Sequence, residues 1–215
     1  KFEFRMVGSS DSIAPANVVL NTIVAESFRE IADELEKADN FDMACHDMIK
    51  KLFTEHHRIV FNGNGYSDEW VEEAERRGLP NIKSMVDAVP ALTAPKAIKL
   101  FESFGVFTES ELRSRAEIKY EAYAKAINIE AKSMIDIASK HIIPAVVSYT
   151  TELANSVIAV SEAGVDSSTQ KELLDEVTKY LKEMKAALKK LTEVTEKASD
   201  ITEGKEQATY FRDVV

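Results

Sequence analysis

The longest stretch of regular hydrophobic spacing runs from Thr108 to about Ala163, where apolar residues recur at steps of three and four. This period is typical of one face of an α-helix. The helix is expected to begin at a capping box, Thr108-Glu109-Ser110-Glu111, and to kink at Pro144, whose ring removes a backbone hydrogen bond. The apolar stripe comprises Leu112, Ala116, Tyr120, Tyr123, Ile127, Ala131, Met134, Ala138 and Ile142.

A second periodic segment follows the turn at Gly164-Val165-Asp166 and ends near Ala198. Residues 167–170 match a second capping box. Because the turn is so short, this helix is expected to fold antiparallel onto the second half of the preceding one, giving a coiled-coil-like hairpin over residues 108–198. The seam positions are Leu174, Val177, Leu181, Met184, Leu188, Leu191, Thr195 and Ala198, and the lysines at 179, 182, 185, 189 and 190 form a solvated face.

Shorter helices are predicted on either side of this hairpin. The upstream ones cover residues 17–38, 42–58, 67–77, 82–88 and 95–104. The alternating Asn and Gly residues of 61–66 indicate a sharp turn in which the glycines take positive φ. Residues 81–105 are expected to form a connector, anchored to a larger body by a cluster of Phe101, Phe104, Val106 and Phe107. The segment after Gly204 is expected to form a helix laid against the hairpin.

The first five residues, Lys1-Phe2-Glu3-Phe4-Arg5, alternate charged and aromatic side chains. Alternation at period two predicts a β-strand that places the three charges on one face. One interpretation is a solvated sheet face with cross-strand charge pairs. The other is a site in which Glu3 ligates a divalent cation while Lys1 and Arg5 meet phosphate or carboxylate oxygens.

The charge, cysteine count and composition of the chain argue against several classes of function. A net charge of −10 argues against sequence-independent binding to nucleic acid or to an anionic membrane. The single cysteine, Cys45, excludes an internal disulfide and fits a reducing cytoplasm. No apolar run is expected to reach the roughly 18 to 20 residues of a membrane span. Few glycines and prolines, with abundant Ala, Glu, Lys and Leu, favour helix.

The N-terminal strand, the following loop Gly8-Ser9-Ser10-Asp11-Ser12 and the helix after it resemble the late catalytic-domain segment of glutamine synthetases. The run Phe61-Asn62-Gly63-Asn64-Gly65-Tyr66-Ser67-Asp68-Glu69-Trp70 makes the type III branch the closer match. The resemblance implies a mainly α fold here. One N-terminal β-strand and helices from the end of an α+β catalytic domain would occupy residues 1–78, and a helical C-terminal extension with the long hairpin residues 79–215.

The resemblance also implies a reaction, its cofactors and the residues that take part in it. Glutamine synthetases use ATP and Mg²⁺ or Mn²⁺ to join ammonia to glutamate through γ-glutamyl phosphate, in cytoplasmic ring-shaped homo-oligomers. In the family motif Arg-x-Glu-x-Arg, the central glutamate ligates the metal and the second arginine holds substrate and phosphoryl oxygens. Carried over by position, Glu3 is a metal ligand, Arg5 the catalytic clamp and Lys1 the nucleotide-side cation. Lys1 departs from the motif, because lysine lacks the arginine fork.

The chain is expected to be a fragment, because its first strand needs sheet partners and most of the implied site would lie upstream. The fragment alone is therefore predicted to be inactive. The alternative is a non-enzymatic helical oligomerisation or scaffolding module. A carboxylate-bridged di-iron bundle is disfavoured because no Glu-x-x-His pair occurs on the long helices. His46 and His57 lie about 16 Å apart along their helix, too far for shared metal ligation, and are expected to be surface residues.

Overall fold

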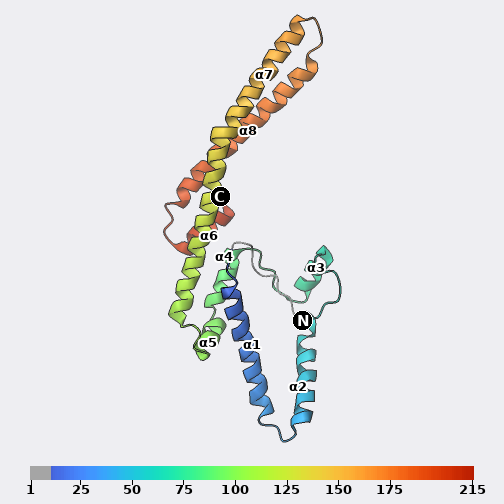
Figure 1. The fold of residues 1–215 in the computed structure, drawn as a ribbon, viewed down its shortest axis with the longest axis vertical. Coiled ribbons are helices and arrows are strands. Elements are labelled where there is room, and N and C mark those ends of the chain that lie inside the picture. Colours follow the sequence, from blue (N-terminus) through green and yellow to red (C-terminus); the bar gives the residue numbers. More distant parts are fainter. Residues whose placement is uncertain (1–10) are drawn as a thin grey trace. The chain divides into compact units, whose positions relative to one another are not determined.

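The computed structural model describes residues 11–215. The regular secondary structure in this range consists of helices joined by turns and loops, with no strand. The predicted strand at Lys1–Val7 lies outside the described residues. The chain divides into two compact units, Lys1–Ser114 and Arg115–Val215, and the division falls inside one long helix (Figure 1). A catalytic domain is predicted to end near residue 78. The division into compact units does not test where that domain ends, so this boundary stays a prediction.

The N-terminal unit opens with two helices, α1 (Ala14–Leu35) and α2 (Phe41–His56), joined by a short connection (Figure 1). Pro15 lies in the first turn of α1, where its missing amide costs nothing. Asn40 caps α2 by accepting a hydrogen bond from the Met43 amide at 3.1 Å. Both predicted helices are confirmed, although α1 begins and ends three residues earlier than expected, and 57–59 form a 3₁₀ turn.

Short helices make up the rest of this unit: α3 (Asp68–Arg76), α4 (Met85–Ala88) and α5 (Pro95–Ser103), with a 3₁₀ turn at Val89–Thr93. The predicted positive φ at Gly63 and Gly65 is wrong. Among the described glycines, positive φ occurs just after α3 at Gly78, just after α5 at Gly105, and at Gly164, so it serves helix ends.

The connector is held to α1 by aromatic contacts, as predicted. The Phe101 and Phe107 rings lie 5.5 Å apart between centroids, and Phe101 is buried. The Arg29 guanidinium of α1 lies 4.5 Å from the centroid of the Phe104 ring, a cation–π contact. The Arg29 contact joins the end of α5 to α1, whereas the Phe101–Phe107 contact lies within the segment that begins with α5.

The predicted long helix is confirmed as one 54-residue helical run, Glu109–Glu162. It consists of α6 (Glu109–Ile137), a π-helical turn at Ala138–Ile142, and α7 (Ile143–Glu162). Its capping box is formed: the Thr108 amide donates to Glu111 Oε2 at 2.8 Å, and the Glu111 amide donates to Thr108 Oγ1 at 3.3 Å. The distortion expected at Pro144 takes the form of the π turn just before it, since a proline ring disturbs the preceding turn.

Two positions of the predicted apolar stripe are not covered. Met134 is 62% exposed and Ile142 45% exposed, whereas the other stripe residues are buried or half-buried. The π turn explains Ile142, because it adds a residue to one turn and so rotates the positions that follow. Met134 lies on the predicted apolar stripe and is nevertheless exposed, so helical periodicity alone does not determine which side chains are buried.

The antiparallel hairpin is confirmed. Helix α8 (Ser168–Ala198) runs back along α7 (Figure 1). Every predicted seam position of α8 is buried or half-buried, and all five predicted surface lysines are exposed. The second capping box is wrong. The Ser167 hydroxyl bonds Ser161 Oγ at 2.8 Å, and Asp166 instead caps the helix by accepting from the Ser168 amide at 3.0 Å.

The expected C-terminal helix is α9 (Gly204–Asp213), and it closes the core of the C-terminal unit. Phe211, Ala198 of α8 and Ala124 of α6 form a buried cluster. The Gln207 side-chain amide donates to the Ala198 carbonyl at 3.0 Å and to the Ile201 carbonyl at 2.9 Å, which satisfies acceptors at the C-terminal end of α8.

The long helix also contains an 18-residue window with a mean hydropathy of 1.2, which by length and composition alone is apolar enough to cross a membrane. The sequence shows no uninterrupted apolar run of that length. The apolar character reflects the low charge of α7, in which Glu152 and Glu162 are the charged residues. In the structure α7 packs along α8.

Truncating Phe211 to alanine is expected to lower the free energy of unfolding of the C-terminal unit by about 3 to 5 kcal/mol, the range for deleting a buried aromatic ring. Urea denaturation followed by circular dichroism measures this. Tyr180→Ala is the control, because Tyr180 is exposed and its loss should cost far less. Equal effects of the two substitutions would show that Phe211 is not part of a core.

Candidate functional site

The three residues that the sequence nominates for catalysis, Lys1, Glu3 and Arg5, lie outside the described residues, so their roles stay predictions. Within residues 11–215, no group of three or more His, Cys, Asp or Glu side chains is placed to hold a metal ion. His46 and His57 are both exposed, as expected for surface histidines. No catalytic step is assigned to the described residues.

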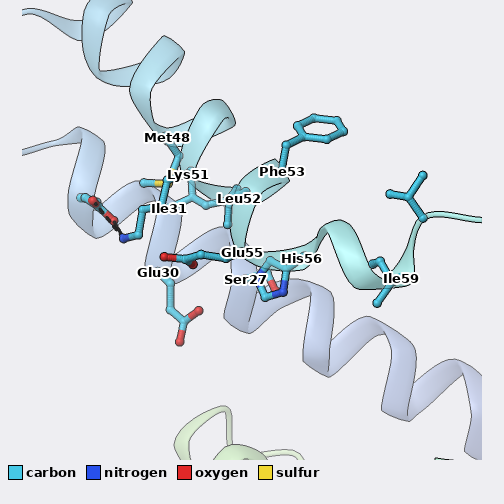
Figure 2. Close-up of a pocket in the computed structure, with 12 residues that line it drawn as sticks. Ser27, Glu30, Ile31, Met48, Lys51, Leu52, Phe53, Glu55, His56 and Ile59 are labelled. Carbon is cyan, nitrogen blue, oxygen red and sulfur yellow. Dashed lines mark hydrogen bonds and ion pairs between the residues drawn. The ribbon is translucent and has the colours of Figure 1, made fainter. Parts of the chain in front are cut away.

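A groove of about 490 Å³ lies between α1 and α2 in the described N-terminal unit (Figure 2). Apolar side chains make up much of its wall: Ile31 of α1, Met48, Leu52 and Phe53 of α2, and Ile59 and Val60 beyond it. Met48 is buried at its base, whereas the Phe53 ring points outward and is 68% exposed. The groove is thus lined by side chains that water solvates poorly.

Polar groups at this groove lie along its edges. The Lys51 ammonium is 3.4 Å from Glu34 Oε2, and both side chains are about half exposed, so this ion pair adds little stability. Glu30, Glu55 and His56 also border the groove (Figure 2). No nucleophile is paired with a base among them, so the groove fits contact with another apolar surface better than catalysis.

The groove is part of a wider apolar surface on the same two helices. Within the described residues, α1 buries only Thr22 and α2 only Met48. Large apolar side chains exposed on the pair and the turn after it are Val19, Ile23, Val24, Phe28, Phe41, Met43, Ile49, Phe53, Ile59 and Val60. Exposed large apolar side chains in this number favour contact with a partner surface over full exposure to water.

A second cluster fixes α3 to the segment before it. The Phe61 and Trp70 rings stack with centroids 3.8 Å apart. The Arg77 guanidinium lies 5.5 Å from the Trp70 ring centroid and donates to the Val60 carbonyl at 2.9 Å. Glu73 accepts hydrogen bonds from Arg76 and Arg77 at 2.5 to 2.6 Å. Sequence reasoning missed this cluster, although an aromatic residue on each side of the loop was a signal for it.

With this geometry in view, comparison with known proteins identifies the family. The profile of the glutamine synthetase C-terminal domain matches residues 44–161, from α2 into α7. The chain belongs to this glutamine synthetase family. The resemblance found in the sequence is thereby confirmed.

Curated glutamine synthetases match much of the chain. It is 42% identical to the type-3 glutamine synthetase of Dictyostelium discoideum over 163 residues, which is 74% of this chain and 22% of that protein. It is 38% identical to a Butyrivibrio fibrisolvens glutamine synthetase over 79% of this chain and 24% of that protein. It is 31% identical to a Bacteroides fragilis glutamine synthetase over 100% of this chain and 31% of that protein.

These glutamine synthetases are much longer than the matched region. The chain spans about a quarter to a third of their length. Their remaining polypeptide has no counterpart in the described residues. The apolar surface of α1 and α2 therefore belongs to a chain whose relatives carry a large additional body.

Hydrogen bonds from Arg76 and Arg77 lower the pKa of Glu73 from 4.5 to about 2. Because the folded-state pKa is depressed, this carboxylate contributes stability above its unfolded pKa, and the contribution is lost as pH falls from about 4.5 towards about 2. A carbon-13 NMR titration is expected to place the Glu73 midpoint near 2.

Glu73→Gln is the matched variant for that titration, because it keeps the shape of the side chain and removes its charge. The variant is expected to show a weaker loss of α3 helicity between pH 4.5 and 2 than the parent chain. A Glu73 midpoint at the ordinary value of 4.5 would contradict the arginine pairing seen in the structure.

Proposed function

We propose that this chain is the C-terminal part of a type III glutamine synthetase. The polypeptide as a whole would catalyse ATP-dependent ligation of ammonia to glutamate. The observation that carries the proposal is the 42% identity to a type-3 glutamine synthetase over 74% of the chain. The profile match over residues 44–161 supports it independently.

In the proposed reaction the γ-phosphoryl group of ATP passes to the side-chain carboxylate of glutamate. Ammonia then displaces phosphate, giving glutamine, ADP and phosphate. Such transfer depends on positioning and on charge stabilisation by cations. Glu3 is proposed to supply one ligand of Mg²⁺ or Mn²⁺, Arg5 to hold substrate and phosphoryl oxygens, and Lys1 to contact the nucleotide. The remaining ligands are expected from polypeptide that the chain does not contain.

The N-terminal unit is proposed to pack against that additional polypeptide through the apolar surface of α1 and α2. Phe28 is 66% and Phe53 68% exposed, and burying such rings on an apolar partner is favourable by roughly 1.5 to 3 kcal/mol each. This packing would attach the predicted strand to its sheet. It also explains why the isolated chain is proposed to be inactive.

The C-terminal unit is proposed to be structural. Its seam joins α7 to α8, and its core of Ala124, Ala198 and Phe211 lies within the unit. The described part of this unit offers no metal-binding cluster. A role in the ring assembly of the synthetase fits a helical arm of this kind, and the proposed location is the cytoplasm.

The experiment compares variants of the intact synthetase that contains this chain, using formation of γ-glutamyl hydroxamate. Glu3→Ala is expected to abolish turnover while assembly is retained, because a metal ligand is lost. Glu36→Ala is the control: Glu36 is an exposed acid just after α1 and should leave turnover unchanged. The isolated 215-residue chain is expected to give no product.

A third variant lacks the distal part of the hairpin and separates the structural role from the catalytic one. Its expected effect is on assembly, measured by size-exclusion chromatography with light scattering. Turnover by the isolated chain, or full activity of the Glu3→Ala enzyme, would overturn the catalytic assignment. If Glu3→Ala altered assembly alone, the scaffolding interpretation would be favoured.

A further inference from the structure

Two Asn-Gly pairs occur in succession in the segment that precedes α3, at Asn62-Gly63 and Asn64-Gly65. All four residues are exposed. An asparagine followed by glycine is chemically labile, because the glycine amide nitrogen has no neighbouring side chain to keep it from the asparagine side-chain carbonyl carbon. Both pairs are the same Asn-Gly dipeptide, so their surroundings in the structure are used to decide which of them reacts first.

The surroundings of Asn64 favour attack of the following glycine nitrogen on the asparagine side-chain carbonyl carbon. The space beside Gly65 is open: a Cβ placed there would have no heavy atom within 4 Å. Asn64 Oδ1 accepts a hydrogen bond from the Tyr66 amide at 3.1 Å, which holds the side chain over the following backbone and draws electrons from its carbonyl carbon. The Gly65 amide donates no hydrogen bond to any described residue. The Gly65 nitrogen is therefore not held by such a hydrogen bond and can turn towards the Asn64 side-chain carbonyl carbon.

Asn62 lies in a more crowded place. A Cβ placed on Gly63 would lie 2.7 Å from Cζ of Phe61. That ring is itself fixed by its stack on Trp70, at 3.8 Å between centroids. The backbone of Gly63 is thus hindered on one side by an anchored ring, which restricts the rotation that ring closure requires.

We propose that Asn64 is a site of spontaneous deamidation through a cyclic imide. The Gly65 nitrogen forms a bond to the Asn64 side-chain carbon, the bond from that carbon to the side-chain nitrogen breaks, and ammonia leaves with the proton of the Gly65 amide. Water then opens the ring. Attack at the side-chain carbon restores the normal chain with aspartate, and attack at the backbone carbon leaves isoaspartate. Water is the only co-reactant, and no oxidation or reduction occurs.

The product is compatible with the structure around it. A carboxylate at position 64 can accept the same hydrogen bond from the Tyr66 amide. It also lies shortly before the N-terminus of α3, where the helix dipole favours negative charge. Each event adds one negative charge to the segment between α2 and α3. This inference does not depend on synthetase activity.

The test incubates the 215-residue chain in mildly alkaline buffer and maps its peptides by mass spectrometry over time. Conversion of amide to carboxylate is expected at position 64 ahead of position 62. Gly65→Ala is the decisive variant: Gly65 has open space and no positive φ, so the fold should be kept while modification at 64 is lost. Asn40, followed by Phe41 and held as a helix cap, is the internal control and should stay unmodified.

Two further measurements make the result unambiguous. Circular dichroism verifies that Gly65→Ala retains the helix content of the parent, and Asn62→Ser shows that modification at 64 proceeds without the first pair. Modification at 62 ahead of 64, no modification at either position, or undiminished modification at 64 in Gly65→Ala would each overturn the proposal.

Discussion

Close packing of one aromatic ring against two alanines holds the C-terminal unit together. Phe211 of α9 meets Ala124 of α6 and Ala198 of α8, so α6 is joined in a single cluster to two helices that lie far from it in the sequence. Alanine at both positions lets the ring approach the helix backbones closely. The bonds from Gln207 to carbonyls at the end of α8 fix the same junction. The α7–α8 hairpin therefore extends from a junction whose core is already packed.

The N-terminal unit buries Val86, Val89, Phe101 and Leu112, all of which follow its first two helices. Helices α1 and α2 themselves bury one residue each and expose several large apolar side chains. The connector is better covered, because Phe101 is buried and Arg29 lies over Phe104. The exposure of α1 and α2 agrees with membership in a family whose curated members are roughly three to four and a half times as long as the matched region. Helices α6, α8 and α9 share a buried cluster, whereas α1 and α2 expose large apolar side chains that further polypeptide can cover.

Sequence reasoning succeeded where local chemistry decides the structure. The Thr108 capping box involves four consecutive residues, and the α8 seam follows from helical period alone, so both were predictable. It failed where the outcome depends on neighbours. Ser167 bonds Ser161 across the turn, and Met134 is exposed although Ala131 and Ala138 of the same stripe are buried. The family could be predicted because a few short motifs are specific. The site at Glu3 could be nominated by that resemblance but not built from the described residues.

Hydrogen exchange measured by mass spectrometry tests the central claim most directly, namely that α1 and α2 need the rest of the synthetase while α7, α8 and α9 do not. Exchange should be compared between the isolated chain and the intact enzyme. The account predicts that amides of α1 and α2 exchange rapidly in the isolated chain and become protected in the intact enzyme, while amides around Thr195 and Ala198 are protected in both. Equal protection of α1 and α8 in the isolated chain would contradict it.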